Sequence, residues 1–147
     1  MDLTTAVKLN IYQTIAATAK APDVGQVAAS MALPAADVQK EFETLAGMRL
    51  LVLELGDKTR IRMASPFSGI ETPFLVSAGG RAYYANCCWD ALGVAAALNQ
   101  DADVIANCAY SGQALPISVR DGRVEPVDCI AHFAVPAALW WRDIVYT

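Results

Sequence analysis

The spacing of apolar residues changes near residue 65, and this change limits the folds that the chain can adopt. Before that point, apolar residues recur every three or four positions, which is the period of amphipathic helices. After it, short apolar runs are separated by turn residues, which is typical of strands. We therefore predict an α+β fold with a helical module at 1–65 and, at 66–147, a mixed or antiparallel sheet domain that carries one helix.

The first 65 residues predict three helices followed by a hairpin. Asp23 is suited to cap the second helix, and Gly56 to Lys58 to form the hairpin turn. Because helix, helix, helix and hairpin follow in the order of a winged helix, we expect a winged-helix-like module. The expected elements are helices at 3–19, 23–31 and 38–48, and strands at 50–55 and 59–63.

Charge argues against nucleic acid as a partner of this module. Residues 1–65 carry seven basic and seven acidic side chains, and residues 66–147 carry four basic and eight acidic ones. Phosphate binding requires a basic surplus, which neither part has. The third predicted helix would enter a DNA groove, yet it carries Asp37, Glu41 and Glu43 against one lysine. We expect the module to serve in packing rather than in DNA recognition.

Residues 66–147 predict strands around a single helix. The stretch from Ser65 to Gly69 has the composition of a linker, and Asp121-Gly122 is a strong hairpin turn. We expect the aromatic residues of this part, Tyr83, Trp89 and the Trp140-Trp141 pair among them, to lie in the core. The expected elements are strands at 72–77, 81–85, 103–107, 115–120 and 124–134, a helix at 87–98, and a short helical piece from Pro136.

The sequence contains no segment that predicts membrane insertion or export. No apolar run approaches the roughly 18–20 residues that are needed to span a bilayer. The first residues lack the positive charge and apolar stretch of a signal peptide. We therefore expect a cytoplasmic protein without a membrane partner.

Four cysteines, Cys87, Cys88, Cys108 and Cys129, all lie in the second part of the chain. In a cytoplasmic protein they are expected to be thiols or metal ligands rather than disulfides. A zinc site with His132 is a weak alternative, because C-x-x-C pairs are lacking and Cys129 and His132 on one strand would face opposite sides. We expect His132 to sit in or beside the core.

The most informative spacing joins Cys87 to Asp90. If Asn86 caps the helix, Cys87 is its first residue and Asp90 lies three positions further on the same face, whereas Cys88 is rotated by about 100°. The helix N-terminus favours the Cys87 thiolate, and an ionised Asp90 disfavours it unless the carboxylate takes up the proton. If the thiol and the carboxyl share one proton, the thiolate could attack a soft electrophile and the carboxylic acid could later deliver the proton. The simpler alternative is a buried small residue beside a helix-capping carboxylate.

Several segments together resemble the organomercurial (alkylmercury) lyase family. The segment GRAYYANCCWDALG, residues 80–93, resembles the catalytic-helix segment of these enzymes, where a cysteine is followed three residues later by aspartate. The segments at 108–112, 132–136 and 140–147 resemble later parts of the family sequence in the same order. The likeness extends over nearly the whole chain.

This resemblance implies roles for individual residues. Cys87 would be the nucleophile that binds mercury, Asp90 the acid and base, and Cys108 a structural cysteine. The family uses no organic cofactor and breaks carbon–mercury bonds by protonolysis, which yields a hydrocarbon and Hg(II). The implied partners are organomercurials or other soft-metal species, and a thiol-bearing acceptor that takes over the mercury.

One departure from the family concerns a second catalytic cysteine, which relatives carry just after the segment that residues 140–147 resemble. Cys88 and Cys129 are the candidate substitutes, although neither aligns with it. The resemblance implies a chain truncated at its C-terminus, and we expect it to bind mercurials and to cleave them poorly or not at all unless Cys88 or Cys129 reaches the site. The resemblance leaves open a non-catalytic thiol module that binds soft metal, or a metal-responsive winged-helix regulator.

Overall fold

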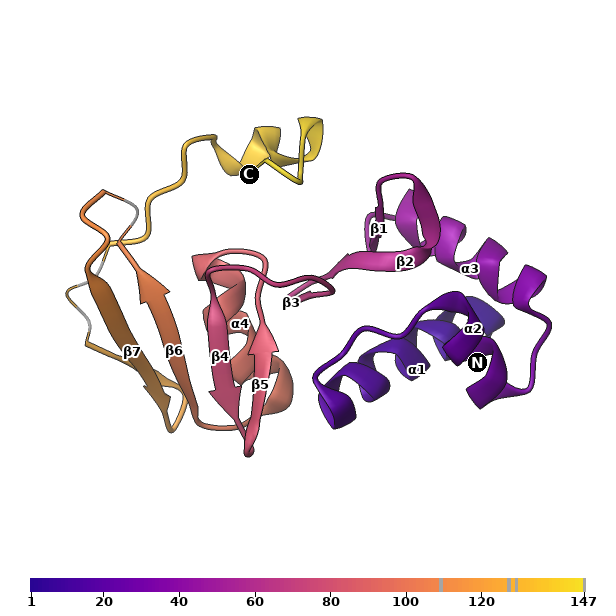
Figure 1. Ribbon diagram of the computed structural model, residues 1–147, viewed down its shortest axis with the longest axis horizontal. Coiled ribbons are helices and arrows are strands. Elements are labelled where there is room, and N and C mark those ends of the chain that lie inside the picture. Colours follow the sequence, from indigo (N-terminus) through magenta and orange to yellow (C-terminus); the bar gives the residue numbers. More distant parts are fainter. Residues whose placement is uncertain (109, 127, 129, 147) are drawn as a thin grey trace.

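The computed structural model of the chain describes residues 1–108, 110–126, 128 and 130–146 (Figure 1). The predicted α+β class is confirmed. Three helices and a small sheet make up one side of the molecule, and a larger sheet with one helix makes up the other. None of the helices in the described residues is long and apolar enough to cross a membrane.

The three N-terminal helices are set by their caps and by one apolar face each. The Asp2 carboxylate accepts the N–H of Thr5, and Asp23 forms a reciprocal capping box with Gln26, so orphan N–H groups at both helix starts are satisfied. The fully buried side chains of this side include Phe42 and Ile11. The helices are α1 (Leu3–Thr18), α2 (Val24–Met31) and α3 (Ala35–Gly47).

The predicted linker forms part of the small sheet. Phe67 and Ser68 form strand β3, which pairs antiparallel with β2, and Phe67 also bridges to Ala85 of the larger sheet side. The composition of residues 65–69 predicts a loop, because composition carries no information on long-range packing. In the structure the Phe67 ring is buried between Tyr12 and Tyr83. The sheet order is β1 (Val52–Glu54), β2 (Asp57–Ala64) and β3 (Phe67–Ser68). The domain boundary at 65/66 stays a prediction.

The larger sheet is antiparallel, in the order β5-β4-β6-β7-β8, and α4 covers one of its faces (Figure 1). Val94 of α4 and Val104 of β6 are both buried, because alternate residues of β6 face this helix. The elements are β4 (Leu75–Ala78), β5 (Arg81–Tyr84), α4 (Cys88–Leu98), β6 (Ala102–Asn107), β7 (Ala114–Arg120) and β8 (Arg123–Glu125).

The last part of the chain departs from the prediction. The Asp121-Gly122 turn is confirmed, with both residues at positive φ, but the strand expected at 124–134 ends at Glu125. The next residue is Pro126, which has no N–H to donate to a neighbouring strand. His132 is exposed, so its expected place in or beside the core is wrong.

After Pro136, as expected, a short helical piece begins, the 3₁₀ helix η1 (Ala137–Arg142). It returns across the top of Figure 1 from the larger sheet toward the β1–β2 hairpin.

The burial of Phe67 predicts a stability effect that an exposed side chain would not show. Phe67 is 3% exposed and packs against aromatic rings from both sides of the molecule, so we expect Phe67→Ala to lower the free energy of unfolding by about 3–5 kcal/mol. Leu55→Ala is the control, because Leu55 is 95% exposed. Chemical denaturation measures both variants. Equal stability of the two would show that Phe67 does not hold the two sides together.

Candidate active site

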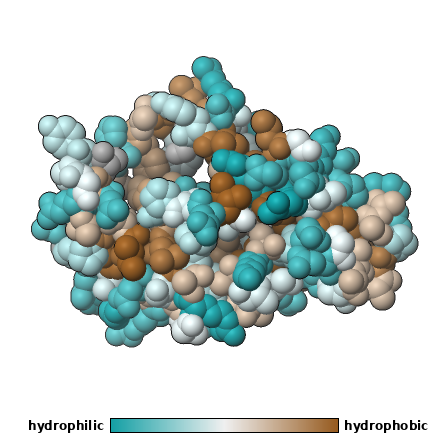
Figure 2. Space-filling model, in the orientation of Figure 1, coloured by the Kyte–Doolittle hydropathy of each residue, from teal (hydrophilic) through white to brown (hydrophobic). Residues whose placement is uncertain are grey.

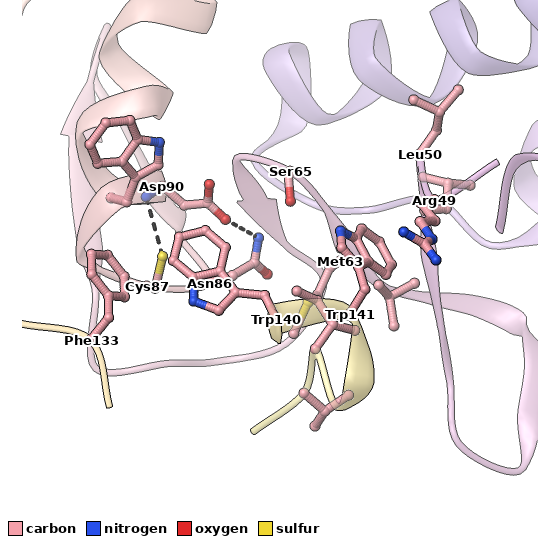
Figure 3. A pocket seen from close by; sticks show the side chains of 15 residues that line it. Arg49, Leu50, Met63, Ser65, Asn86, Cys87, Asp90, Phe133, Trp140 and Trp141 are labelled. Atoms are coloured by element: carbon pink, nitrogen blue, oxygen red, sulfur yellow. Dashed lines mark hydrogen bonds between the residues drawn. The ribbon is translucent and has the colours of Figure 1, made fainter. Parts of the chain in front are cut away.

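A pocket of about 180 Å³ lies where the small sheet, the start of α4 and the C-terminal segment (residues 133–146) meet (Figure 3). Its walls are mainly apolar and aromatic. On the face shown in Figure 2, hydrophobic residues gather in the middle of the molecule beneath the C-terminal segment. The lining residues are Arg49, Leu50, Leu51, Val52, Met63, Ser65, Asn86, Cys87, Trp89, Asp90, Phe133, Trp140, Trp141, Ile144 and Val145.

Cys87 and Asp90 both line this pocket, from the first turn of α4. The helix begins one residue later than predicted, because Cys87 itself is the N-cap and its sulfur accepts the N–H of Asp90 at 3.5 Å. Asn86, the predicted cap, instead donates its side-chain N–H to the Asp90 carboxylate at 2.7 Å. Capping by Asn86 is thus replaced by capping through a sulfur atom, which is a weak acceptor.

The Asp90 carboxyl lies half-buried between two donors. Burial raises the pKa of Asp90, and hydrogen bonds from the side chains of Asn86 and Ser65 lower it in part. Figure 3 shows the carboxylate pointing toward the Asn86 amide, with the Ser65 side chain nearby on the β2–β3 turn. A carboxyl in such surroundings holds its proton to higher pH than an exposed aspartate does.

The Cys87 thiol is less acidic than its position at a helix N-terminus suggested. Burial raises the pKa of Cys87, the N–H of Asp90 lowers it, and the negative charge of Asp90 raises it again. The N–H at the helix start therefore lowers the pKa of Cys87 as predicted, but by less than burial raises it. Cys87 lines the pocket as a thiol, and its conversion to the nucleophilic thiolate requires a neighbouring group that accepts the proton.

The other cysteines lie elsewhere. Cys88 lines a separate cavity of about 630 Å³, which Cys108 also lines. A hydrogen bond from the Ser111 side chain lowers the pKa of Cys108. Cys129 lies outside the described residues. Among the residues that the structure describes, no three histidine, cysteine or acidic side chains are arranged to hold a metal ion, and the zinc alternative has no support there.

No spacing pattern along the chain indicates the lining residues that other segments contribute. Ser65 comes from the turn between β2 and β3, and Arg49 follows α3. The expectation that the aromatic residues lie in the core is correct for Tyr83, which is buried, and wrong for Trp89, which is 66% exposed.

The two tryptophans of the C-terminal segment make different kinds of contact: Trp140 packs within the segment, and Trp141 contacts the three-helix side. The Trp140 ring packs on Phe133 at 5.0 Å between ring centroids, and its Nε1 donates to the Val135 carbonyl at 2.8 Å. The Arg49 guanidinium lies over the Trp141 ring, 5.3 Å from its centroid. This cation–π contact links the three-helix side to the C-terminal segment.

Comparison with known proteins gives two findings. The family model described as MerB, alkylmercury lyase, matches residues 67–147. Ten chains of solved structures match the fold, among them the crystal structure of the mercury-bound form of MerB2. That match has a TM-score of 0.66 and 24% sequence identity, and covers 84% of this chain and 59% of that one. No protein in a search of curated sequences matches this chain.

The pKa directions of the thiols predict their order of reactivity. At neutral pH we expect iodoacetamide to modify Cys108 faster than Cys87, because the pKa of Cys108 is lowered and that of Cys87 is raised. The rate at Cys87 should rise as the pH increases through its raised pKa. Asp90→Asn removes the nearby negative charge and should move that rise to lower pH.

Peptide mass spectrometry measures the modification at each cysteine. Asp103→Asn, which changes an exposed aspartate on β6, is the control and should leave the Cys87 profile in place. An unchanged profile in Asp90→Asn would contradict the electrostatic coupling of the pair.

Proposed function

This chain belongs to the alkylmercury lyase family, and on that premise we propose that it binds organomercurials at Cys87 and uses Asp90 to protonate the carbon released from mercury. The observation that carries the proposal is the placement of both side chains in one apolar pocket at the first turn of α4. The chain spans only 59% of the length of the MerB2 structure that it matches, so activity and substrate are part of the proposal.

The first step is formation of a sulfur–mercury bond. Thiolate sulfur is a natural ligand of Hg(II), because soft donors prefer soft metals. The Cys87 proton passes to the Asp90 carboxylate as the sulfur binds mercury, and the anionic ligand of the organomercurial leaves. The raised pKa of Asp90 supports this role, since a carboxyl that readily takes up a proton is the better acceptor.

The second step is protonolysis. The protonated Asp90 gives its proton to the carbon, the carbon–mercury bond breaks, and its electron pair forms the new C–H bond. The hydrocarbon leaves, and Hg(II) stays on the Cys87 sulfur. This chemistry uses no organic cofactor.

A second thiolate on mercury would weaken the bond to carbon by adding electron density to the metal. Of the cysteines that the structure describes, Cys87 alone lines this pocket, and Cys88 faces another cavity. We propose that a thiol from solution supplies this ligand and that the Hg(II) product passes to a thiol-bearing acceptor. The three described cysteines are free thiols, which supports a reducing, cytoplasmic setting as part of the same proposal.

The proposal predicts separate losses in two variants. Cys87→Ser should lose binding of a simple organomercurial, because the sulfur ligand is gone. Asp90→Asn should still bind it, with solvent taking up the Cys87 proton in place of Asp90, and should release hydrocarbon roughly 10²–10⁴-fold more slowly, because the proton donor is gone. Cys108→Ser is the control and should keep both properties. Gas chromatography of released hydrocarbon, in the presence of excess free thiol, measures the rate.

The pocket volume predicts a size limit on the organic group. An apolar cavity of about 150 Å³ can hold a benzene ring, and this pocket has about 180 Å³. We therefore expect methyl- and phenylmercury to bind, and a naphthylmercury compound to bind weakly. Trp140→Ala enlarges the pocket and should improve binding of the larger compound. Isothermal titration measures the affinities, and equal affinity for all three compounds in the unchanged protein would contradict the limit.

A second candidate, a module that binds soft metal without catalysis, is favoured by the single described thiol in the pocket. It predicts tight binding of Hg(II) at Cys87 and no hydrocarbon at any thiol concentration. A metal-responsive regulator would in addition bind a specific DNA sequence in a gel shift at moderate salt. The neutral charge of residues 1–65 argues against that result.

A further inference from the structure

The side chain of Asn86 makes more contacts than a helix start requires. Its Nδ2 donates to Asp90 Oδ2 at 2.7 Å and to the backbone carbonyl of Phe67 at 3.3 Å, with the Pro66 carbonyl at 3.5 Å. These acceptors belong to different segments, since Asp90 lies on α4 and Phe67 on β3. The two N–H bonds of the amide are thereby divided between the carboxyl and the β3 backbone.

These contacts allow only one orientation of the amide. Backbone carbonyls can only accept, so the nitrogen and not the oxygen must face Phe67. The opposite orientation would also bring the Asn86 oxygen against the Asp90 carboxylate. In the observed orientation Oδ1 is buried and has no hydrogen-bond partner among the described residues. A buried acceptor without a partner is unfavourable, so the hydrogen bonds that Nδ2 donates must maintain the orientation of the amide.

We propose that Asn86 is a positioning residue for Asp90, which holds one carboxyl oxygen in place and keeps the carboxyl able both to take up and to release a proton. The proposal rests on the function proposed above, in which Asp90 does both. A donor fixed on Oδ2 holds the carboxyl in one orientation during proton exchange. Asn86 touches Asp90 rather than the reacting atoms, so it acts through the carboxyl.

The surroundings of Asp90 explain why such a donor is needed. Burial raises the pKa of the carboxyl, and the Asn86 amide is the larger of the two hydrogen-bond effects that oppose it, the other being Ser65. A donor to the carboxylate favours the ionised form. With burial alone, a smaller fraction of Asp90 would be in the ionised form that can accept the Cys87 proton.

The other titratable or charged groups around Asp90 do not take over this role. Tyr12 of α1 has its pKa raised, first by burial and then by the Asp90 charge, so it is a neutral neighbour. The Cys87 thiol on α4 has a raised pKa as well. Arg49, which lines the same pocket, has its guanidinium over the Trp141 ring. The proton affinity of Asp90 therefore reflects burial, opposed in part by the neutral donors Asn86 and Ser65.

The test is a titration of the Asp90 carboxyl by NMR in protein labelled with ¹³C at aspartate carboxyls. The Asp90 resonance is the one that is missing in Asp90→Asn. In Asn86→Ala we expect its midpoint to move to higher pH by about one unit, the size of one hydrogen bond to an ionised group. Asn107→Ala, which removes an asparagine of β6, is the control and should leave the midpoint in place. If Asn86→Ala does not fold, Asn86→Leu has nearly the same shape, has no N–H to donate and adds no charge, and it should also move the midpoint upward.

A purely structural role for Asn86 gives a different result. It would lower stability and leave the Asp90 midpoint unchanged, which would overturn the proposal. Hydrocarbon release is measured separately in the same proteins and should fall roughly tenfold in Asn86→Ala, with the pH optimum shifted upward. If the unchanged protein releases no hydrocarbon while the Asp90 midpoint moves as expected, the lyase function fails and the positioning role of Asn86 stands.

Discussion

The arrangement of the pocket depends on the burial of Phe67 between α1 and β5. Its ring lies against Tyr12, at 6.4 Å between centroids, and against Tyr83, at 5.6 Å. The hydroxyl of Tyr83 donates to the Ala16 carbonyl, and that of Tyr12 donates to the Ser65 carbonyl. The Tyr83 hydrogen bond crosses between the two sides of the molecule, and the Tyr12 hydrogen bond joins α1 to the β2–β3 turn. Because Ser65 lies two residues before Phe67, this packing also brings the β2–β3 turn to the Asp90 carboxyl.

The apolar walls of the pocket have two effects that oppose each other in the proposed function. Apolar walls suit an organic group and exclude water, but they also raise the pKa of any carboxyl beside them. Hydrogen bonds from neutral donors reduce that effect without adding a charge that would compete for the thiolate. A cationic partner would have stabilised the carboxylate more strongly and would have kept it from accepting a proton at neutral pH. The choice of an amide and a hydroxyl is therefore consistent with a carboxyl that changes its protonation state.

The sequence predicted the local features and missed those that arise from distant contacts. The Asp23 cap, the Asp121-Gly122 turn and the order of helices and strands follow from neighbouring residues, so spacing and turn chemistry are sufficient to predict them. The same holds for Cys87 and Asp90, which lie within one helical turn. Strand β3 was predicted as a loop, because its pairing depends on a ring that packs against residues far away in the chain. The long strand expected after Val124 ends at Glu125, before a proline.

Capping by Cys87 fixes the position of the thiol relative to Asp90 at the start of α4. A cap of asparagine or serine would leave Cys87 as an ordinary helical residue with its sulfur free to turn away. As the cap, the sulfur is held by the backbone N–H of Asp90, whose side chain we propose as its proton acceptor. In the proposed function, mercury would replace this weak hydrogen bond by a stronger bond to sulfur, which is a poor hydrogen-bond acceptor. The hydrogen bond at the helix start thus joins the proposed mercury ligand directly to the residue that carries the proposed acid.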